Sequence, residues 1–308
     1  MRVPLTSLSL KWGEGDPRNI LEERMFFQQI ISGIAMGGMY GLVALGFILI
    51  WNAAAVINFA QGEFCMVSGF LTLSFFVTWG WPFPAAVLMA ILLTGILGVI
   101  VERFAIRPIR GADPATAVIA TIGVSIFLSN SAKFVWGSQP FYFPSIFGDK
   151  PIQFGRITLI PQNLWIIGII LTLVILLYLF FFKTITGKVM RAVAQDRETA
   201  SLMGISINRI IGMIFGLSAI LGGLAGILLA PVIYVASDIG LILVLKAFVG
   251  SVIGGFGSLP GALIGGIVIG VSENLSAFYI SSDYKDVIVF GVLIAILVFK
   301  PSGLFSKK

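Results

Sequence analysis

Long apolar runs separated by short polar stretches dominate this chain. Several runs reach the roughly 18 to 20 residues that a helix needs to cross a bilayer. We expect about nine apolar helical segments, which cover residues 27–50, 64–80, 85–101, 115–135, 164–182, 210–233, 241–256, 261–280 and 286–300. Some are short or interrupted by glycine, so the number of full spans falls to about eight if they are re-entrant. The pattern predicts an all-α membrane protein, a polytopic bundle of about eight or nine transmembrane segments with broken or short helices.

Composition supports this class and excludes others. Of the 308 residues, 58% are hydrophobic and 11% are charged, which is too little polar surface for a soluble domain. The chain has no histidine, so imidazole metal sites and histidine acid–base catalysis are excluded. Its single cysteine, Cys65, cannot form an internal disulfide.

Basic residues gather in short stretches between the apolar runs. The net charge of +6 therefore reports membrane orientation rather than binding to nucleic acid, because lysine and arginine are enriched in cytoplasmic loops. We expect residues 103–110, residues 183–209 and the C-terminus on the cytoplasmic side. Residues 137–163 are expected to form the longest external loop, with a short hairpin.

The segment 183–209 is the most polar interruption of the apolar pattern. Its middle predicts a short helix, with Asp196 as the N-cap, Glu198 in the first turn and Gly204 at the C′ position. Its basic residues are Lys183, Lys188, Arg191, Arg197 and Arg209. Two interpretations stay open at this point: a basic loop that sets topology, or a helix that docks into another protein.

A second polar stretch, residues 51–64, lies directly against apolar sequence. It carries Asn58, Gln61 and Glu63, and polar groups inside a membrane need partners. One interpretation is a broken helix that lines a pathway. The other is a short loop at the membrane surface.

Glycine is arranged in two informative patterns. In residues 254–266, Gly257, Pro260 and Gly261 predict a tight turn between closely packed half-spans. Small residues at every fourth position let membrane helices approach closely, and the first span has them on one face at Gly33, Gly37 and Gly41.

Residues 1–24 are polar and mixed in charge, without the apolar core of a signal peptide. We expect them to form an N-terminal tail, with Met25 as an alternative start. Residues 25–308 are expected to form one transmembrane domain.

Catalytic motifs are missing from the sequence. The pair Gly187-Lys188 is followed by Val189 and lacks the upstream glycine of a nucleotide-binding loop. We therefore expect no ATP hydrolysis by this chain, no catalytic residues, no metal site and no cofactor of its own.

Several motifs resemble a known family. VINFAQGEFCMVSGF (56–70), RAVAQDRETASLMGI (191–205), LKAFVGSVIGGFGSLPGALIGG (245–266) and the tail 284–305 are similar to the branched-chain amino acid ABC transporter permease family, LivH type. The resemblance covers nearly the whole chain from Met25 onward. It implies a subunit that forms the translocation path for branched-chain or related small hydrophobic amino acids, in a bacterial cytoplasmic (inner) membrane.

The resemblance also implies partners and a coupling site. The partners would be a second, related permease subunit, two ATP-binding cassette subunits that bind the ATP, and a substrate-binding protein, all in contact with membrane lipid and none with nucleic acid. ETASLMG (198–204) resembles the EAAxxxG coupling motif of importers, with Thr199 in place of an alanine. The implied coupling residues are Arg191, Asp196, Arg197, Glu198, Ala200 and Gly204.

Alternatives stay open. Within the same superfamily the cargo could be urea or a short amide. A different class, an ion-coupled secondary transporter, needs charges inside the membrane, and Glu63, Lys246 and Glu273 are the candidates. A structural membrane protein is a third possibility.

Overall fold

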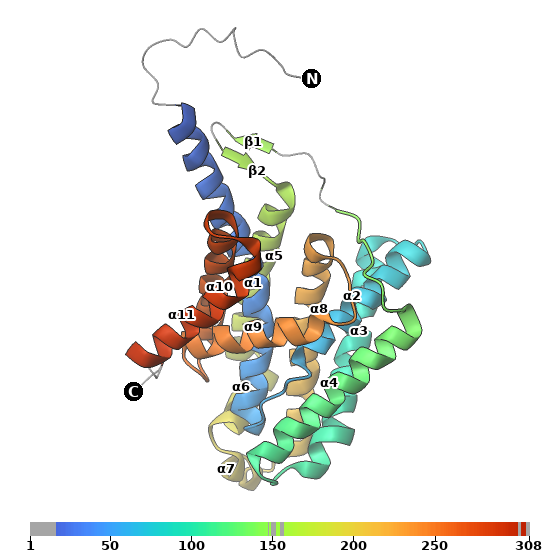
Figure 1. The fold of residues 1–308 in the computed structure, drawn as a ribbon. Helices are drawn as coiled ribbons and strands as arrows, with labels where there is room; N and C mark the ends of the chain where they lie inside the picture. Colours follow the sequence, from blue (N-terminus) through green and yellow to red (C-terminus); the bar gives the residue numbers. More distant parts are fainter. Residues whose placement is uncertain (1–16, 147, 149–151, 155–156, 301–302, 306–308) are drawn as a thin grey trace.

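A computed structural model describes residues 17–146, 148, 152–154, 157–300 and 303–305, and within these ranges the chain is a bundle of helices (Figure 1). The α-helices are α1 Pro17–Ala54, α2 Gln61–Leu73, α3 Phe83–Val101, α4 Pro114–Trp136, α5 Pro161–Lys183, α6 Ile185–Gln195, α7 Arg197–Leu202, α8 Ile207–Ile233, α9 Ile239–Gly254, α10 Leu259–Tyr279 and α11 Lys285–Phe299. Short π-helical turns η1 (Ser74–Thr78) and η2 (Glu102–Ile106) extend α2 and α3, and 3-10 turns occur at η3 (Arg107–Ile109) and η4 (Ser282–Tyr284).

The prediction of an all-α polytopic membrane protein is confirmed. Six helical segments of the described chain are long and apolar enough to cross a membrane: Met25–Ala54, Phe83–Ile109, Pro114–Trp136, Pro161–Lys183, Ile207–Ile233 and Leu259–Tyr279. The second of them consists of α3, η2 and η3. The predicted segments 64–80, 241–256 and 286–300 form shorter helices, α2 with η1, α9 and α11. In Figure 1, α9 lies crosswise to the long helices, so it is an internal cross-piece of the bundle rather than an ordinary full span.

Helix α1 forms the centre of the bundle. In an apolar stretch of 18 residues of α1, 89% of the residues are buried. The same measure gives 17% for α5 and 22% for α4. A buried helix that is apolar all round belongs in the core of a membrane bundle. The outward faces of α4 and α5 are therefore left for lipid or other subunits.

Glycines form the contact between α1 and α10. A methyl group at Gly37 would lie 2.6 Å from the carbonyl oxygen of Gly266, and one at Gly270 would overlap the backbone of Gly37. A methyl group at Gly33 would lie 2.7 Å from the Cα of Val271. The predicted close packing of the first span is confirmed, and its partner is α10, which runs antiparallel to α1.

Replacing Gly270 with alanine is expected to destabilise the fold by about 3 kcal/mol, the upper part of the usual range for overpacking, because the two backbones must separate. Gly168→Ala in α5 is the matched control, since nothing lies within 4 Å of a methyl group there. Thermal unfolding in detergent, followed by size-exclusion chromatography, measures both. Equal midpoints for the two variants would contradict the contact.

The end of the bundle opposite α7 carries the predicted hairpin. Strands β1 (Ile152–Phe154) and β2 (Ile157–Leu159) pair antiparallel, with Ile152 opposite Leu159. The same end holds the start of α1 (Figure 1), where the helix begins at Pro17, upstream of Met25. Part of the predicted polar tail is thus helical, and residues 1–16 lie outside the described residues.

Candidate functional site

Helix α7 has the capping that the sequence predicts. The Asp196 Oδ1 accepts hydrogen bonds from the backbone nitrogens of Glu198, at 3.0 Å, and Thr199, at 3.1 Å. The Thr199 hydroxyl donates to Asp196 Oδ2 at 2.6 Å, and these hydrogen bonds, the hydroxyl's first, lower the pKa of Asp196 from its ordinary value of 3.8. Gly204 follows the helix with a φ of +81°, a conformation that favours glycine.

The cap is expected to matter for the position of α7. Asp196→Ala removes the side-chain acceptor and should destabilise the first turn of α7, whereas Asp196→Asn keeps an acceptor and should retain most of its stability. The pKa of Asp196 is lowered in the folded protein. The charged cap therefore contributes fully to stability above the ordinary pKa of 3.8, and this contribution is lost as the pH falls through the lowered pKa. Hydrogen exchange of the backbone amides of α7 measures the effect in the two variants, and equal protection would contradict it.

Helix α7 presents apolar side chains outward. Ala200 is buried in the main hydrophobic core, while Leu202 is 87% exposed and Met203 is 80% exposed. Both exposed residues lie in the segment that is richest in basic residues, at the end of the bundle that carries α6 and α7 (Figure 1). Exposed apolar side chains that are grouped on a polar surface are typical of a contact with another protein.

Helix α6 was not predicted as a separate element. Its N-cap is Thr184, whose side-chain oxygen accepts a hydrogen bond from the Gly187 nitrogen at 3.0 Å. Its buried residues Gly187, Met190 and Val193 recur at every third position, which is the signal that could have revealed an amphipathic helix. Among the expected coupling residues, Arg191 lies in α6 rather than α7, with its guanidinium 4.3 Å from the centre of the Phe182 ring.

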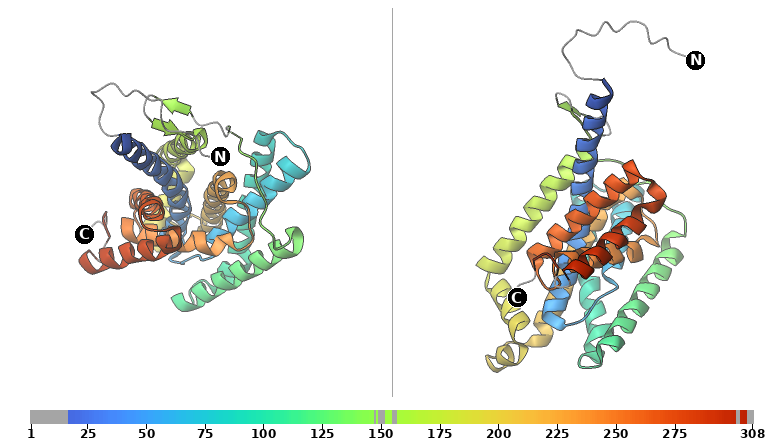
Figure 2. Two further views of the ribbon diagram at one scale, coloured as in Figure 1. Left: turned by 45° about the horizontal axis from the view of Figure 1, so that its top comes forward. Right: turned by 60° about the vertical axis from the view of Figure 1, so that its left-hand side comes forward.

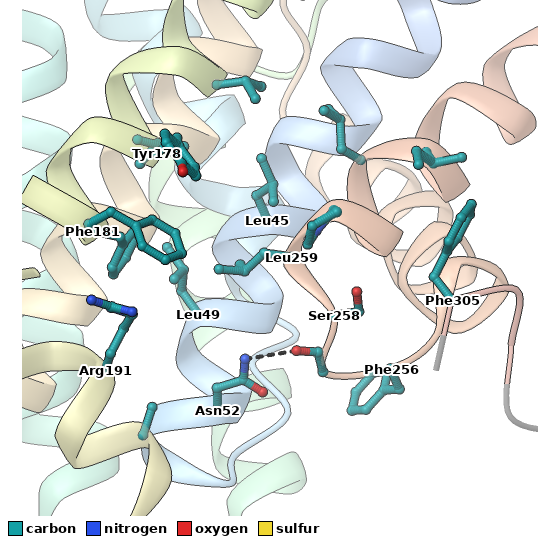
Figure 3. A pocket seen from close by; sticks show the side chains of 18 of the residues that line it. Leu45, Leu49, Asn52, Tyr178, Phe181, Arg191, Phe256, Ser258, Leu259 and Phe305 are labelled. Atoms are coloured by element: carbon teal, nitrogen blue, oxygen red, sulfur yellow. Dashed lines mark hydrogen bonds between the residues drawn. The ribbon is translucent and has the colours of Figure 1, made fainter. Parts of the chain in front are cut away.

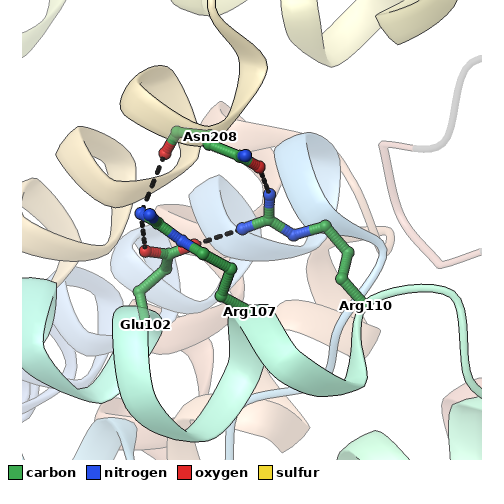
Figure 4. A network of polar contacts seen from close by, with 4 residues as sticks. All are labelled: Glu102, Arg107, Arg110 and Asn208. Carbon is green, nitrogen blue, oxygen red and sulfur yellow. Dashed lines mark hydrogen bonds and ion pairs between the residues drawn. The ribbon is translucent and has the colours of Figure 1, made fainter.

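A polar network joins the end of α3 to the start of α8 (Figure 4). Glu102 is fully buried and forms ion pairs with Arg107, at 2.7 Å, and with Arg110. Arg110 Nη1 donates to the Asn208 side-chain oxygen at 2.5 Å, and Arg107 Nη2 donates to the Asn208 carbonyl at 3.4 Å. The sequence indicates only membrane orientation for these arginines. In the structure they also connect the end of α3 to Asn208 at the start of α8.

The break between α1 and α2 lies inside the bundle. Ala55 has a φ of +53°, and Asn58, Gln61 and Glu63 are at most 2% exposed. This burial disagrees with an exposed surface loop and agrees with a broken helix. The same residues also have structural partners, so their burial alone does not assign a pathway role.

Two hydrogen-bonded pairs connect this break to α8 and α4. Gln61 Nε2 donates to the Ser218 carbonyl at 3.0 Å, and the Ser218 hydroxyl lies 2.8 Å from Gln61 Oε1. Ser125 of α4 donates to Glu63 Oε1 at 2.7 Å. The Asn58 Nδ2 and the second Glu63 oxygen are buried without a hydrogen-bond partner among the described residues.

A cavity of about 900 Å³ lies near the turn between α9 and α10 (Figure 3). Gly257 and Pro260 line it, and Asn52 of α1 donates to the Gly257 carbonyl at 2.9 Å. The predicted tight turn is present: Ser258 caps α10 by accepting from the Gly261 nitrogen at 3.2 Å. Gly261 itself packs against the backbone of Gly254, so it allows α9 and α10 to approach closely at the turn.

Comparison with known proteins decides the family. Residues 29–297 match the model of the family described as branched-chain amino acid transport system / permease component. The chain belongs to this family. It is a permease component of a branched-chain amino acid transport system, as the sequence motifs suggested, and a multi-pass membrane protein.

Two curated relatives of this permease component span nearly its whole length. The high-affinity branched-chain amino acid transport system permease protein LivH of Escherichia coli K12 is 34% identical, over 92% of this chain and 96% of that protein. The high-affinity branched-chain amino acid transport system permease protein BraD of Pseudomonas aeruginosa is 32% identical, over the same shares of the two chains.

A solved structure shares the fold of the permease. PsaBC from Streptococcus pneumoniae in complex with Fab aligns with a TM-score of 0.53 and 15% identity, over 92% of this chain and 96% of that chain. At this identity the likeness concerns the fold alone.

Lys246 and Glu273, the two other residues considered for ion coupling, are buried and belong to one cluster of charged and polar side chains in the permease. Lys246 of α9 lies 2.6 Å from Glu273 of α10 and 3.0 Å from Asp286 of α11. Tyr40 of α1 donates to the second Glu273 oxygen at 2.9 Å. The cluster therefore joins four helices, which supports a structural role for Lys246 and Glu273.

Proposed function

We propose that this permease is a membrane subunit of an ATP-driven ABC importer and that α7 is its contact with an ATPase subunit. The observation that carries the proposal is α7 itself: a capped helix, anchored in the core by Ala200, with Leu202 and Met203 exposed at the basic end of the bundle. A helix built in this way can seat in a groove of a soluble protein and move with it.

The polar contacts offer a route for that movement into the membrane. A shift of α7 would act on Asn208, directly beyond it, and through the paired arginines on Glu102 of α3. It would also act along α8 to Ser218, which is bonded to Gln61 at the helix break. Alternating access by helices that move around a broken segment fits this arrangement.

The proposal also includes candidate residues that would line the passage for the cargo. Broken helices in transporters often line the passage, and two such places in the described part of the chain are candidates. They are the break with Asn58, Gln61 and Glu63, and the turn with Gly257, Pro260 and Gly261.

The printed names of LivH and BraD favour branched-chain amino acids as cargo. The proposed assembly contains a second related permease subunit, two ATP-binding cassette subunits that bind the ATP, and an extracytoplasmic binding protein, in a bacterial inner membrane. A permease that only lines a passage leaves much of the selection to such a binding protein, so urea or a short amide is the cargo to compare.

Purification of the tagged full-length chain in mild detergent tests the assembly. We expect an ATPase and a second permease subunit to be identified with it by mass spectrometry. Recovery of the folded chain alone in several detergents, together with uptake that does not depend on ATP, would contradict the proposal.

A further inference from the structure

The cavity of about 900 Å³ has an unusual combination of lining groups. Its wall is mostly apolar and comes mainly from α1, α5, α6, α10 and the turn before α10, with Leu45, Leu49, Tyr178 and Leu259 among its residues (Figure 3). Of the described residues that line it, Arg191 alone carries a charge. A site with one cation and a long apolar wall favours an anionic amphiphile.

Arg191 is available to such a ligand. Its Nε is buried and has no hydrogen-bond partner among the described residues, although its guanidinium stacks on Phe182. A buried donor without a partner is costly, and an anionic oxygen would satisfy it. The side chain belongs to helix α6, which follows α5 directly and buries Gly187, Met190 and Val193 on one face. An amphipathic helix next to a membrane span is suited to lie at a membrane surface.

Helix α5 lines the cavity with Val174, Leu177 and Tyr178 and also has an exposed apolar outer face. Helices α5 and α10 lie on either side of α1 (Figure 2). The outer face of α5 exposes Leu171, Ile175 and Leu179, which is typical of a helix in contact with lipid. A lipid beside this face would have its acyl chain next to the apolar wall of the cavity and its phosphate near Arg191.

A transported amino acid fits the cavity less well. Its ammonium group needs an acceptor of negative charge, and no carboxylate is among the described lining residues. The volume of about 900 Å³ is also at the upper end of the range for drug-sized ligands, much larger than one small amino acid needs.

We propose that this cavity is a binding site for one anionic phospholipid, whose phosphate contacts Arg191 and whose acyl chain packs between α5 and α10. Basic residues beside membrane helices attract anionic headgroups, and here the attraction is combined with a preformed apolar cavity. The proposal assigns Gly257 and Pro260 to this site instead of the cargo passage, and it does not depend on the proposed ATPase contact at the outward face of α7.

Retention of defined lipids by the full-length chain tests this site. The purified protein is incubated with dioleoyl phosphatidylglycerol and dioleoyl phosphatidylcholine, which share acyl chains and differ in headgroup, and bound lipid is counted by native mass spectrometry. We expect preferential retention of phosphatidylglycerol. Arg191→Gln should reduce it about tenfold, the effect of one hydrogen bond to a charged group.

Two further variants make the test specific. Lys188→Gln removes an exposed charge of the same sign from the same helix, outside the cavity lining, and should change retention little. Ile264→Trp narrows the cavity without removing a charge and should lower retention of both lipids. Equal losses for Lys188→Gln and Arg191→Gln, equal retention of the two lipids, or displacement of the lipid by millimolar leucine would overturn the proposal.

Discussion

Leu202→Asp combined with Met203→Asp is expected to abolish leucine uptake while the permease still inserts and folds. The two side chains are 87% and 80% exposed, so their replacement removes no packing within the chain. It places two charges where we propose an apolar contact with an ATPase. Burying an unpaired charge in an interface costs several kcal/mol, which is enough to prevent docking. Uptake of radiolabelled leucine by cells that lack the natural gene measures the result.

The matched control lies at the opposite end of the bundle. Ile280 follows α10 and is 66% exposed, so Ile280→Asp adds a charge at an exposed apolar position far from α7. We expect this variant to retain uptake. Normal uptake by the double α7 variant at equal abundance would contradict the proposed contact.

Lys246→Met is expected to destabilise the permease by about 3 to 5 kcal/mol, the usual cost of removing one partner of a buried ion pair. Lys246 and Glu273 are each 5% exposed and lie 2.6 Å apart. Without the lysine that contacts both Glu273 and Asp286, the remaining partners of the buried Glu273 among the described residues are Tyr40 and the more distant Lys285. The midpoint of thermal unfolding in detergent should fall clearly.

Two controls separate this structural role from ion coupling. Lys285→Gln removes a half-exposed lysine whose distance to Glu273 is 3.8 Å, and it should have a small effect. Lys246→Met with Glu273→Gln removes both charges of the close pair and should recover part of the lost stability. A Lys246→Met protein with unchanged stability but uptake that no longer follows an ion gradient would support the secondary transporter instead.

The sequence predicts the local features well because their causes are local. Asp196 and Gly204 define α7 through capping chemistry within a few residues. The spacing of Gly33, Gly37 and Gly41 shows that a close helix contact exists. It could not show that α10 is the partner, because that depends on the tertiary arrangement of helices far apart in the chain.

The sequence does not predict polar contacts between residues that are far apart along the chain. Lys246 and Glu273 are separated by 27 residues, and nothing in their surroundings indicates that they meet. Glu102 lies next to several arginines in the sequence. Because arginines are enriched in cytoplasmic loops, membrane orientation alone accounts for their presence, and the sequence does not indicate that Glu102 pairs with them. The position of Arg191 at a cavity also depends on α6, a helix that the sequence did not predict as a separate element.

Accumulation of leucine in proteoliposomes tests the central claim most directly. The permease is purified with its partners and reconstituted, the binding protein and leucine are added on one side, and ATP is supplied on the other. Our account predicts leucine accumulation that requires ATP and continues after ionophores remove ion gradients. Accumulation that occurs without ATP and stops with the ionophore would contradict it.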